Sequence, residues 1–338
     1  PLLEGILEQF TLMLVENGLL DLSSVYIDGT KIESVSNKYR FVWRGSVEKH
    51  QAKLQAKIRE SLSLPAEASK EDIRKAVKKA RNHCRQECKK QKIVFVYGSG
   101  KRKTEVQREY EKYEEWLEKL DSYEKHLAVM GERNSYAKTD PDATFMRMKE
   151  DHMRNGQLKP AYNIQCASSG YFIVGSYASH HPSDRYTLPL FVEKLTKSYG
   201  KLMDKIVADA GYESEENYVY LEKKGLRAFI KPSNYEQAKT RNYQKQMQER
   251  DSYTYWEEQD CYVHPNGKRF VRVADRVSKK KSGYQTTSKV YRCFDWNEDG
   301  QKTKSLYFTE KLNHYRQKSW ENITSEEGII ERINRSIQ

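Results

Sequence analysis

The chain has 338 residues, of which 60 are lysine or arginine and 48 are aspartate or glutamate, so its formal net charge at pH 7 is +12. This length allows a sizeable core and two or three structural units, and the basic balance favours an acidic partner, most often nucleic acid. No run of about 18 apolar residues occurs, which excludes a membrane-spanning helix. Five scattered cysteines indicate a reducing, cytoplasmic setting rather than a disulfide framework.

The first part of the chain predicts a helix and then a strand. Apolar residues recur at helical spacing over 2–17, and Asn17-Gly18 ends the helix. The run Val25-Tyr26-Ile27 is β-branched or aromatic and leads to Asp28-Gly29. Such a run predicts a buried strand that ends by delivering a carboxylate to the rim of a sheet.

Three helices are expected over the next ninety residues. Residues 47–62 are amphipathic, Ser69 to Asp72 is a capping box that opens a very basic helix to about residue 90, and a third helix covers 104–130. The third helix carries apolar residues at alternating steps of four and three, which predicts a helical hairpin or short coiled coil. The basic helix either presents a solvated face or follows DNA phosphates with four residues: Lys75, Lys78, Lys79 and Arg81.

The segment Gly98-Ser99-Gly100-Lys101 invites comparison with a phosphate-binding loop. Its glycine spacing is wrong for such a loop, and Lys101 is not followed by Ser or Thr. We therefore assign it to a turn between helices.

Short strands and helices alternate from Tyr162 onward. A hairpin is predicted over 162–177, followed by a helix over 187–199 and a strand that ends at Asp209 in Ile206-Val207-Ala208-Asp209-Ala210-Gly211. A helix over 214–224 and a strand over 227–232 follow. This order predicts a mixed α/β sheet.

The remaining segments are expected to lie outside that sheet. Residues 233–250 are polar and indicate a mobile linker, whereas 251–310 predict a β-rich insertion of short aromatic strands. Turns are predicted at Pro265-Asn266-Gly267, Ser282-Gly283 and Glu298-Asp299-Gly300. A final helix is expected from Thr324.

Two interpretations of Asp28 and Asp209 follow from the residues alone. Two carboxylates converging on Mg²⁺ beside a basic surface would suit metal-dependent nucleotidyl transfer. Asp-Gly and Asp-Ala-Gly are also ordinary turn sequences, so both residues could instead be turn or helix-capping aspartates.

Four strings, in order along the chain, resemble DDE-type transposases of bacterial insertion sequences, in particular the insertion sequence eleven-eighty-two family. They are Asp28-Gly29-Thr30-Lys31-Ile32-Glu33, with Asn37-Lys38-Tyr39 and Val42-Trp43 after it; Met148-Lys149-Glu150-Asp151; Gly156-Gln157-Leu158-Lys159-Pro160-Ala161-Tyr162-Asn163-Ile164-Gln165; and Val207-Ala208-Asp209-Ala210-Gly211-Tyr212-Glu213-Ser214-Glu215-Glu216-Asn217-Tyr218. The resemblance covers nearly the whole chain.

The resemblance implies an α/β fold: a ribonuclease-H-like mixed sheet with a helical hairpin insertion and a β-rich insertion. In that fold the first and fourth strands are parallel neighbours, so Asp28 and Asp209 would meet at one edge as the first two catalytic, metal-binding acids. Two Mg²⁺ ions, for which Mn²⁺ could substitute, would serve phosphodiester hydrolysis and strand transfer. The implied partners are double-stranded DNA, as terminal inverted repeats and as target, and a second copy of the chain in a homodimer, without a membrane; the implied location is the cytoplasm, at the nucleoid.

The third acid is where the chain departs from the family pattern. Ser325-Glu326-Glu327-Gly328 and the arginines that follow match the lead-in to the family's catalytic glutamate, which by this alignment lies just past Gln338. The chain is therefore expected to be a fragment cut at both ends that lacks one metal ligand. Glu326, Glu327 and Glu331 are substitutes in principle, although each suits a helix start or a solvent-facing position.

The resemblance also suggests DNA contacts and a division of the chain. Seven residues are candidates for contact with DNA: Thr30, Lys31, Lys159, Asn163, Tyr212, Asn217 and Lys231. The expected parts are 1–44 (end of an N-terminal helical region and first core strand), 45–135 (helical insertion), 136–232 (ribonuclease-H-like core), 233–310 (linker and β-rich insertion) and 311–338 (start of the C-terminal core helix). The alternative functions are a non-catalytic DNA-binding transposase relic and a metal-dependent nuclease that cuts without joining.

Overall fold

A computed structural model describes residues 2–37, 39–98, 102–148, 156–280, 282–296 and 303–337. The chain divides into two compact units. The first, here called the sheet unit, comprises Pro1–Thr30 and Asn163–Gln338, and the second, the helical unit, comprises Lys31–Tyr162. No helix in the described ranges is both long and apolar enough to cross a membrane.

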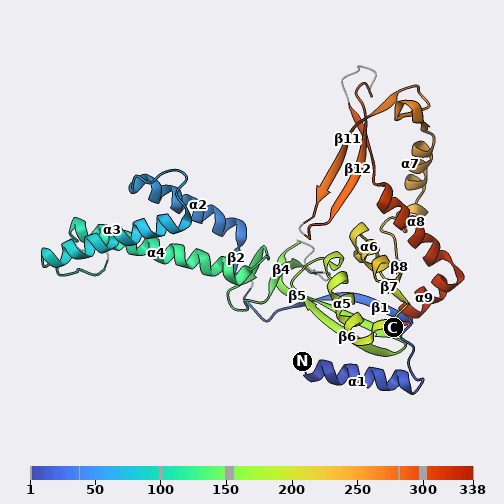
Figure 1. Ribbon diagram of the computed structural model, residues 1–338, viewed down its shortest axis with the longest axis horizontal. Coiled ribbons are helices and arrows are strands. Elements are labelled where there is room, and N and C mark those ends of the chain that lie inside the picture. The colour runs from blue at the N-terminus through green and yellow to red at the C-terminus, as the bar shows by residue number, and fades with distance from the viewer. Residues whose placement is uncertain are drawn as a thin grey trace. The chain divides into compact units, whose positions relative to one another are not determined.

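The sheet unit is built on a mixed sheet (Figure 1). Its strands are β1 (Ser24–Glu33), β5 (Leu158–Ser169), β6 (Phe172–Ser179), β7 (Lys205–Ala208) and β8 (Arg227–Ile230). They lie in the order β5-β1-β7-β8, and both β6 and a sixth strand, β4 (Thr144–Arg147), pair with β5. Strands β5 and β6 form an antiparallel hairpin, and β7 runs parallel to both β1 and β8. Counted along the chain without β4, the first and fourth strands are therefore parallel neighbours.

Both faces of the central strands are covered. Val25, Ile27 and Ile206 pack in one core with α5 (Leu188–Tyr199) and α6 (Glu215–Lys223). Tyr26 and Val207 point to the opposite face and pack with Ile323 of α8 (Glu310–Thr324). Burial on both faces explains why these strands are continuous apolar runs rather than alternating ones.

The last two helices of the chain meet at a close turn. Helix α9 (Glu326–Ile337) follows α8 after Ser325. A Cβ added at Gly328 would overlap with the Asn322 carbonyl oxygen and with the Ile323 backbone, so the turn needs a residue without a side chain. The glycine of the Ser-Glu-Glu-Gly string thus lets the two helices approach, and α9 lies next to β7 (Figure 1).

A second sheet occupies the stretch in which the sequence predicts a β-rich insertion. Its antiparallel strands are β9 (Thr254–Trp256), β10 (Cys261–Val263), β11 (Arg269–Lys279), β12 (Gln285–Cys293) and β13 (Lys304–Phe308). Phe270, Tyr291 and Cys293 form its small core. The turn predicted at Glu298-Asp299-Gly300 lies outside the described residues.

The segment expected to be a linker contains a helix. After a 3₁₀ turn at Gln237–Lys239, α7 spans Arg241–Asp251, and the Thr240 side chain accepts the backbone N–H of Tyr243 as its N-cap. The polar composition hides this helix because none of its residues is buried. The N-cap threonine is the local signal that predicts it.

The helical unit consists of three packed helices and short strands. Its helices are α2 (Arg44–Ser61), α3 (Lys70–Lys90) and α4 (Glu105–Met130), and its strands are β2 (Phe41–Trp43), β3 (Ser135–Ala137) and β4 (Thr144–Arg147), with the beginning of β5. Ser69 and Asp72 form the predicted capping box. Ile58, Ile73, Val77 and Trp116 are in the shared core. The turn at Gly98-Ser99-Gly100-Lys101 lies largely outside the described residues.

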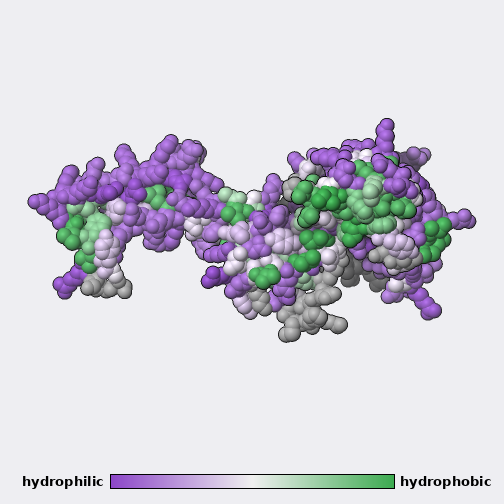
Figure 2. Space-filling view, turned by 90° about the horizontal axis from the view of Figure 1, so that it is seen from below, coloured by the Kyte–Doolittle hydropathy of each residue, from purple (hydrophilic) through white to green (hydrophobic). Residues whose placement is uncertain are grey.

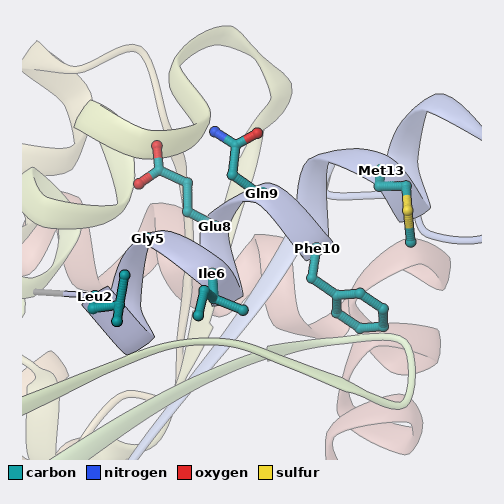
Figure 3. Close-up of a pocket in the computed structure, with 7 residues that line it drawn as sticks. All are labelled: Leu2, Gly5, Ile6, Glu8, Gln9, Phe10 and Met13. Atoms are coloured by element: carbon teal, nitrogen blue, oxygen red, sulfur yellow. The ribbon is translucent and has the colours of Figure 1, made fainter.

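Helix α1 (Leu2–Glu16) presents an apolar side to the surface of the sheet unit. Leu14 packs into the core, whereas Ile6, Phe10 and Met13 are exposed. Figure 3 shows these three side chains projecting from one side of α1 along an open pocket, opposite Glu8 and Gln9. Figure 2, which views the molecule from the side on which α1 lies in Figure 1, shows hydrophobic surface gathered over this region.

A buried ion pair ties α8 to the sheet unit's core. Glu213 is 4% exposed, and its carboxylate accepts N–H groups of Arg316 at 2.7 and 3.1 Å and the backbone N–H of Ser233 at 2.9 Å. Burial raises the pKa of Glu213, but the hydrogen bonds from Arg316 and Ser233 outweigh burial, so the pKa lies below its usual value.

This shift has a definite sign for stability. A carboxyl whose pKa is lowered by folding contributes stability above its unfolded pKa and loses it as the pH falls through the folded pKa. We expect Glu213→Gln to lower the free energy of unfolding by about 2 kcal/mol at neutral pH. The difference from wild type should shrink below about pH 4. Urea unfolding over a pH series measures it, and a difference that stays constant in acid would contradict this origin.

Candidate active site

Two aspartates lie next to each other at one end of the paired strands β1 and β7. The parallel register runs from Ser24 opposite Lys205 to Ile27 opposite Ala208. Asp28 is the next residue on β1, and Asp209 directly follows the end of β7, where it caps a 3₁₀ turn. The register therefore brings the two residues to the same end of the β1–β7 pair.

The prediction that the first strand ends at Asp28 is wrong. Strand β1 continues through Asp28 to Glu33. Only its pairing with β7 ends at Ile27, and β5 lies along its other edge. The Asp28 side chain is 66% exposed, so the carboxylate is accessible although the backbone around it remains in the sheet.

Each aspartate is fixed by a backbone N–H just after it. Oδ1 of Asp28 accepts the N–H of Gly29 at 2.8 Å, and Oδ1 of Asp209 accepts the N–H of Gly211 at 2.8 Å. The second contact caps a 3₁₀ turn over Ala210–Tyr212. These bonds hold one oxygen of each carboxylate and orient both groups before any ligand binds.

A buried hydrogen-bond network lies directly beneath the two aspartates. The Tyr212 hydroxyl donates to Oε1 of Gln165 at 2.5 Å, and Nε2 of Gln165 donates to Oδ1 of Asp184 at 3.1 Å. The Asn163 amide also donates to that oxygen, at 2.8 Å. Asn163, Gln165 and Tyr212 are each 0% exposed. We refer to Asn163, Gln165, Asp184 and Tyr212 as the amide network.

The amide network touches both glycines that follow the aspartates. A Cβ at Gly29 would overlap with Nε2 of Gln165 and would lie 2.9 Å from Oδ1 of Asp184 and 3.0 Å from the Tyr212 hydroxyl. A Cβ at Gly211 would lie 2.9 Å from Oδ1 of Asp209 and 3.3 Å from Oδ2 of Asp184. The network therefore supports both turns that carry the acids.

Negative charge accumulates at this edge of the sheet. Burial raises the pKa of Tyr212 far above its usual value, and the charges of Asp184, Asp28 and Asp209 raise it further. Within the described ranges, the one ion pair to these three carboxylates joins Arg335 to Asp28, with 3.7 Å between Nη2 and Oδ1. Asp184 is held by the amides of Asn163 and Gln165, whereas among the described residues Asp28 has only this long ion pair and its local backbone contact.

The alternative third acids lie away from the pair. The Glu331 carboxylate accepts the Ser24 hydroxyl at 2.8 Å, forms a hydrogen bond with Tyr26 and pairs with Lys205 at 2.7 Å. Ser24 and Lys205 begin their strands four residues before the aspartates, about 13 Å along the sheet. The Glu331 carboxylate is thus bound by other side chains near the end of the β1–β7 pair that is far from the aspartates.

The two glutamates before it are also unsuitable. Hydrogen bonds from Arg227 and Lys205 lower the pKa of Glu327 to about 2, which keeps its carboxylate at the beginnings of β7 and β8. Glu326 is exposed in the first turn of α9. In the described part of the chain, no group of three or more His, Cys, Asp and Glu side chains is arranged to hold a metal ion.

Three of the residues expected to contact DNA are buried. Asn163 and Tyr212 belong to the amide network, and Asn217 is 1% exposed, with its amide donating to the carbonyl oxygens of Tyr212 and Arg185. Side chains at 0 to 1% exposure are not accessible to a phosphate, although the amide oxygen of Asn217 has no hydrogen-bond partner among the described residues. For these three the expectation of a DNA contact is replaced by an internal, supporting role.

The other four candidates lie at the surface. Thr30 is exposed in β1, and Lys231 pairs with Glu236 at 2.6 Å. In the helical unit, Lys31 donates to the Arg147 carbonyl oxygen at 2.9 Å and Lys159 pairs with Glu33 at 2.7 Å. To bind a phosphate, each of the three lysines would have to give up its present partner, whereas Thr30 would give up only water.

Sequence reasoning misses Asp184 and Gln165 as site residues. The signal for Gln165 is present, because Asn163 and Gln165 place two amides on one side of a strand that is otherwise buried. Asp184 has no such signal. It lies in a short turn over Asp184–Tyr186, where aspartate is common, and only the fold brings it beneath the pair.

Comparison with known proteins identifies the family of the chain. The family model described as "Transposase DDE domain" matches residues 134–337, which is more than half of the chain. The matched segment contains Asp209 and the amide network, whereas Asp28 precedes it. Comparison with curated proteins and with solved structures found no match.

Proposed function

Because this chain belongs to the transposase DDE domain family, we propose that it cuts and joins DNA at the ends of an insertion sequence, by metal-dependent phosphodiester hydrolysis followed by strand transfer. Transposase function is common to the family. The insertion sequence eleven-eighty-two branch, the use of two metal ions and the residues named below are our proposal.

The observation that carries this proposal is the position of Asp28 beside Asp209. Both residues come directly after the β1–β7 pairing, at the same end of it. The order β5-β1-β7-β8, with β1 and β7 parallel and adjacent, supports a ribonuclease-H-like core. The helical unit and the second sheet would then be its two insertions.

The donor set at this edge suits a hard divalent cation. Mg²⁺ takes oxygen ligands and is usually bound by one or two carboxylates together with water and substrate phosphate. The carboxylate of Asp28 is exposed and that of Asp209 is half-exposed. Their one ion pair in the described ranges is the long contact between Asp28 and Arg335. Bound Mg²⁺ or Mn²⁺ would activate the attacking oxygen and stabilise the leaving oxygen.

The residues of the chain have separate tasks in this proposal. Asp28 and Asp209 bind the cations, the amide network keeps the two carboxylates in register, and Arg335 balances charge beside Asp28. Thr30, Lys31, Lys159 and Lys231 remain candidates for contact with the DNA backbone. None of these residues needs to shuttle a proton.

The third acid stays a prediction, and the direction of α9 supports it. Glu327, Glu331 and Arg335 follow one another at intervals of one helical turn, and their partners progress from Arg227 and Lys205 to Asp28. A residue one turn past Arg335 would continue this line toward the aspartates. The sequence-based expectation of a glutamate just past Gln338 agrees with that direction.

The substrate would be double-stranded DNA carrying the terminal inverted repeats of an element, with a second duplex as the target. Joining two ends at one target requires two active sites, so we propose that a homodimer acts on paired ends.

The deciding experiment incubates the full-length protein with a duplex that carries the element's end, with Mg²⁺ or Mn²⁺ and with a chelator. We expect metal-dependent nicking and, with a pre-cut 3′-hydroxyl end, products joined to a target plasmid. Nicking without joined products would favour a nuclease. DNA binding without nicking at any metal concentration would favour a non-catalytic relic.

A further inference from the structure

The positive charge of the chain is concentrated in the helical unit. Residues 31–162 contain 31 lysines and arginines against 20 aspartates and glutamates. The other 206 residues contain 29 against 28, so the sheet unit is nearly neutral. A surface that attracts a polyanion is therefore expected in the helical unit.

Charge is also divided among the helices within that unit. Helix α3 carries nine basic and three acidic residues, whereas α4 carries four basic and eight acidic residues. A solvated surface usually mixes the two signs. Here one helix attracts a polyanion and the helix packed against it repels one, which gives the unit a basic side.

One face of α3 is basic along its length. Ile73, Val77, Cys84 and Cys88 form its buried face. At 3.6 residues per turn, the opposite face contains Asn82 and Gln86 at its centre. Five exposed cations lie on the same side and are here called the basic stripe: Lys75, Lys78, Lys79, Arg85 and Lys89. The stripe extends over fourteen residues, about 21 Å.

The cations of the stripe are not held in ion pairs among the described residues, although the charge of Lys75 helps to lower the pKa of Asp72. Elsewhere on α3, Arg74 pairs with Asp121 and Glu124 of α4, and Lys90 pairs with Glu87. In the described ranges none of the five stripe residues forms an ion pair. Their charges are therefore available to a ligand.

We propose that the basic stripe of α3 is a docking surface for the phosphate backbone of duplex DNA, separate from the aspartate pair. This inference rests on the proposed function and adds the surface that provides its sequence-independent affinity. Duplex DNA carries one charge per about 1.7 Å of its axis, so a stripe about 21 Å long can reach several phosphates. Lysine and arginine on a helix face are suited to such contacts.

The test measures the salt dependence of DNA binding by the full chain. The stripe variant replaces Lys75, Lys78, Lys79 and Lys89 by glutamine, which has a similar helix propensity. The slope of log K against log salt is negative, and each neutralised phosphate contributes about −0.9 to it. Loss of four phosphate contacts should therefore make the slope shallower by about 3 to 4. Fluorescence anisotropy with a random duplex at several salt concentrations gives both slopes.

A matched control removes the same charge from the sheet unit. It replaces Lys197, Lys201, Lys223 and Lys245, which are exposed and form no ion pair in the described ranges, by glutamine. We expect the wild-type slope for this control. Equal slopes for both variants, whether shallower than the wild type or not, would overturn the inference, because the effect would then not belong to the stripe.

Two further outcomes separate the possible failures. If the wild type binds the duplex and the stripe variant keeps its slope, the inference fails while the proposed function stands. If the wild type binds no duplex at any salt concentration, the proposed function fails as well. Binding to phosphatidylserine vesicles through these four lysines, with unchanged DNA slopes, would assign the stripe to a membrane surface and overturn the inference.

Discussion

Asp28→Asn and Asp209→Asn are each expected to lower the rate of metal-dependent DNA nicking by about 1000-fold, equivalent to ~4 kcal/mol of transition-state free energy. Asparagine keeps the shape of the side chain and one oxygen, and removes the charge that binds a cation. In the proposed function the two residues act together in one metal centre, so the double variant should be no more than a few fold slower than either single variant. Single-turnover nicking with Mg²⁺ measures all three rates.

Binding and folding distinguish this effect from damage to the protein. Each aspartate accepts a local backbone N–H, and Asp28 has in addition only a long, partly exposed ion pair with Arg335. The variants should therefore keep the thermal stability of the wild type and its affinity for duplex DNA. Asp251→Asn, at the exposed end of α7, is the matched control and should nick at the wild-type rate. Full activity of Asp28→Asn would remove Asp28 from the site. Strictly additive losses would show that the two residues act separately.

Gly29→Ala is expected to disrupt the site without touching a charged group. The added methyl would overlap with Nε2 of Gln165, whose amide cannot withdraw because it is buried and holds both Tyr212 and Asp184. Overpacking of this kind costs about 1 to 3 kcal/mol in the free energy of unfolding. A shift of about 1 Å in the neighbouring Asp28 should lower nicking about 100-fold. Urea unfolding and single-turnover rates at saturating metal test both effects.

The control for this prediction is Gly5→Ala. Gly5 lies in α1, and a Cβ there would meet nothing within 4 Å. Because alanine favours the helix, that variant should be slightly more stable than the wild type and equally active. If Gly29→Ala behaved in the same way, the amide network would not press against Gly29, and its supporting role would have to be abandoned.

Local features of the sequence determined many of the elements. The Ser69 capping box fixes the beginning of α3, and the apolar runs before Asp28 and Asp209 predict strands that the fold buries on both faces. These predictions succeed because capping, helical period and apolar runs depend on neighbouring residues only. Helix α7 was missed because it buries no residue and so shows no apolar period.

Tertiary structure alone decided what surrounds the two acids. Asp28 remains inside β1 because β5 lies along the other edge of that strand. Asp184 supports both turns because the segment between β6 and α5 packs beneath them. The ends of α3 were encoded by residues beside them, whereas the partners of Asp28, Gln165 and Arg335 come from distant segments. A polar side chain carries no local mark of its partner, because that partner is chosen by which strands and helices become neighbours. The sequence by itself therefore established the basic character of the chain and singled out Asp28 and Asp209 as candidates, and the fold decided how these two residues are held.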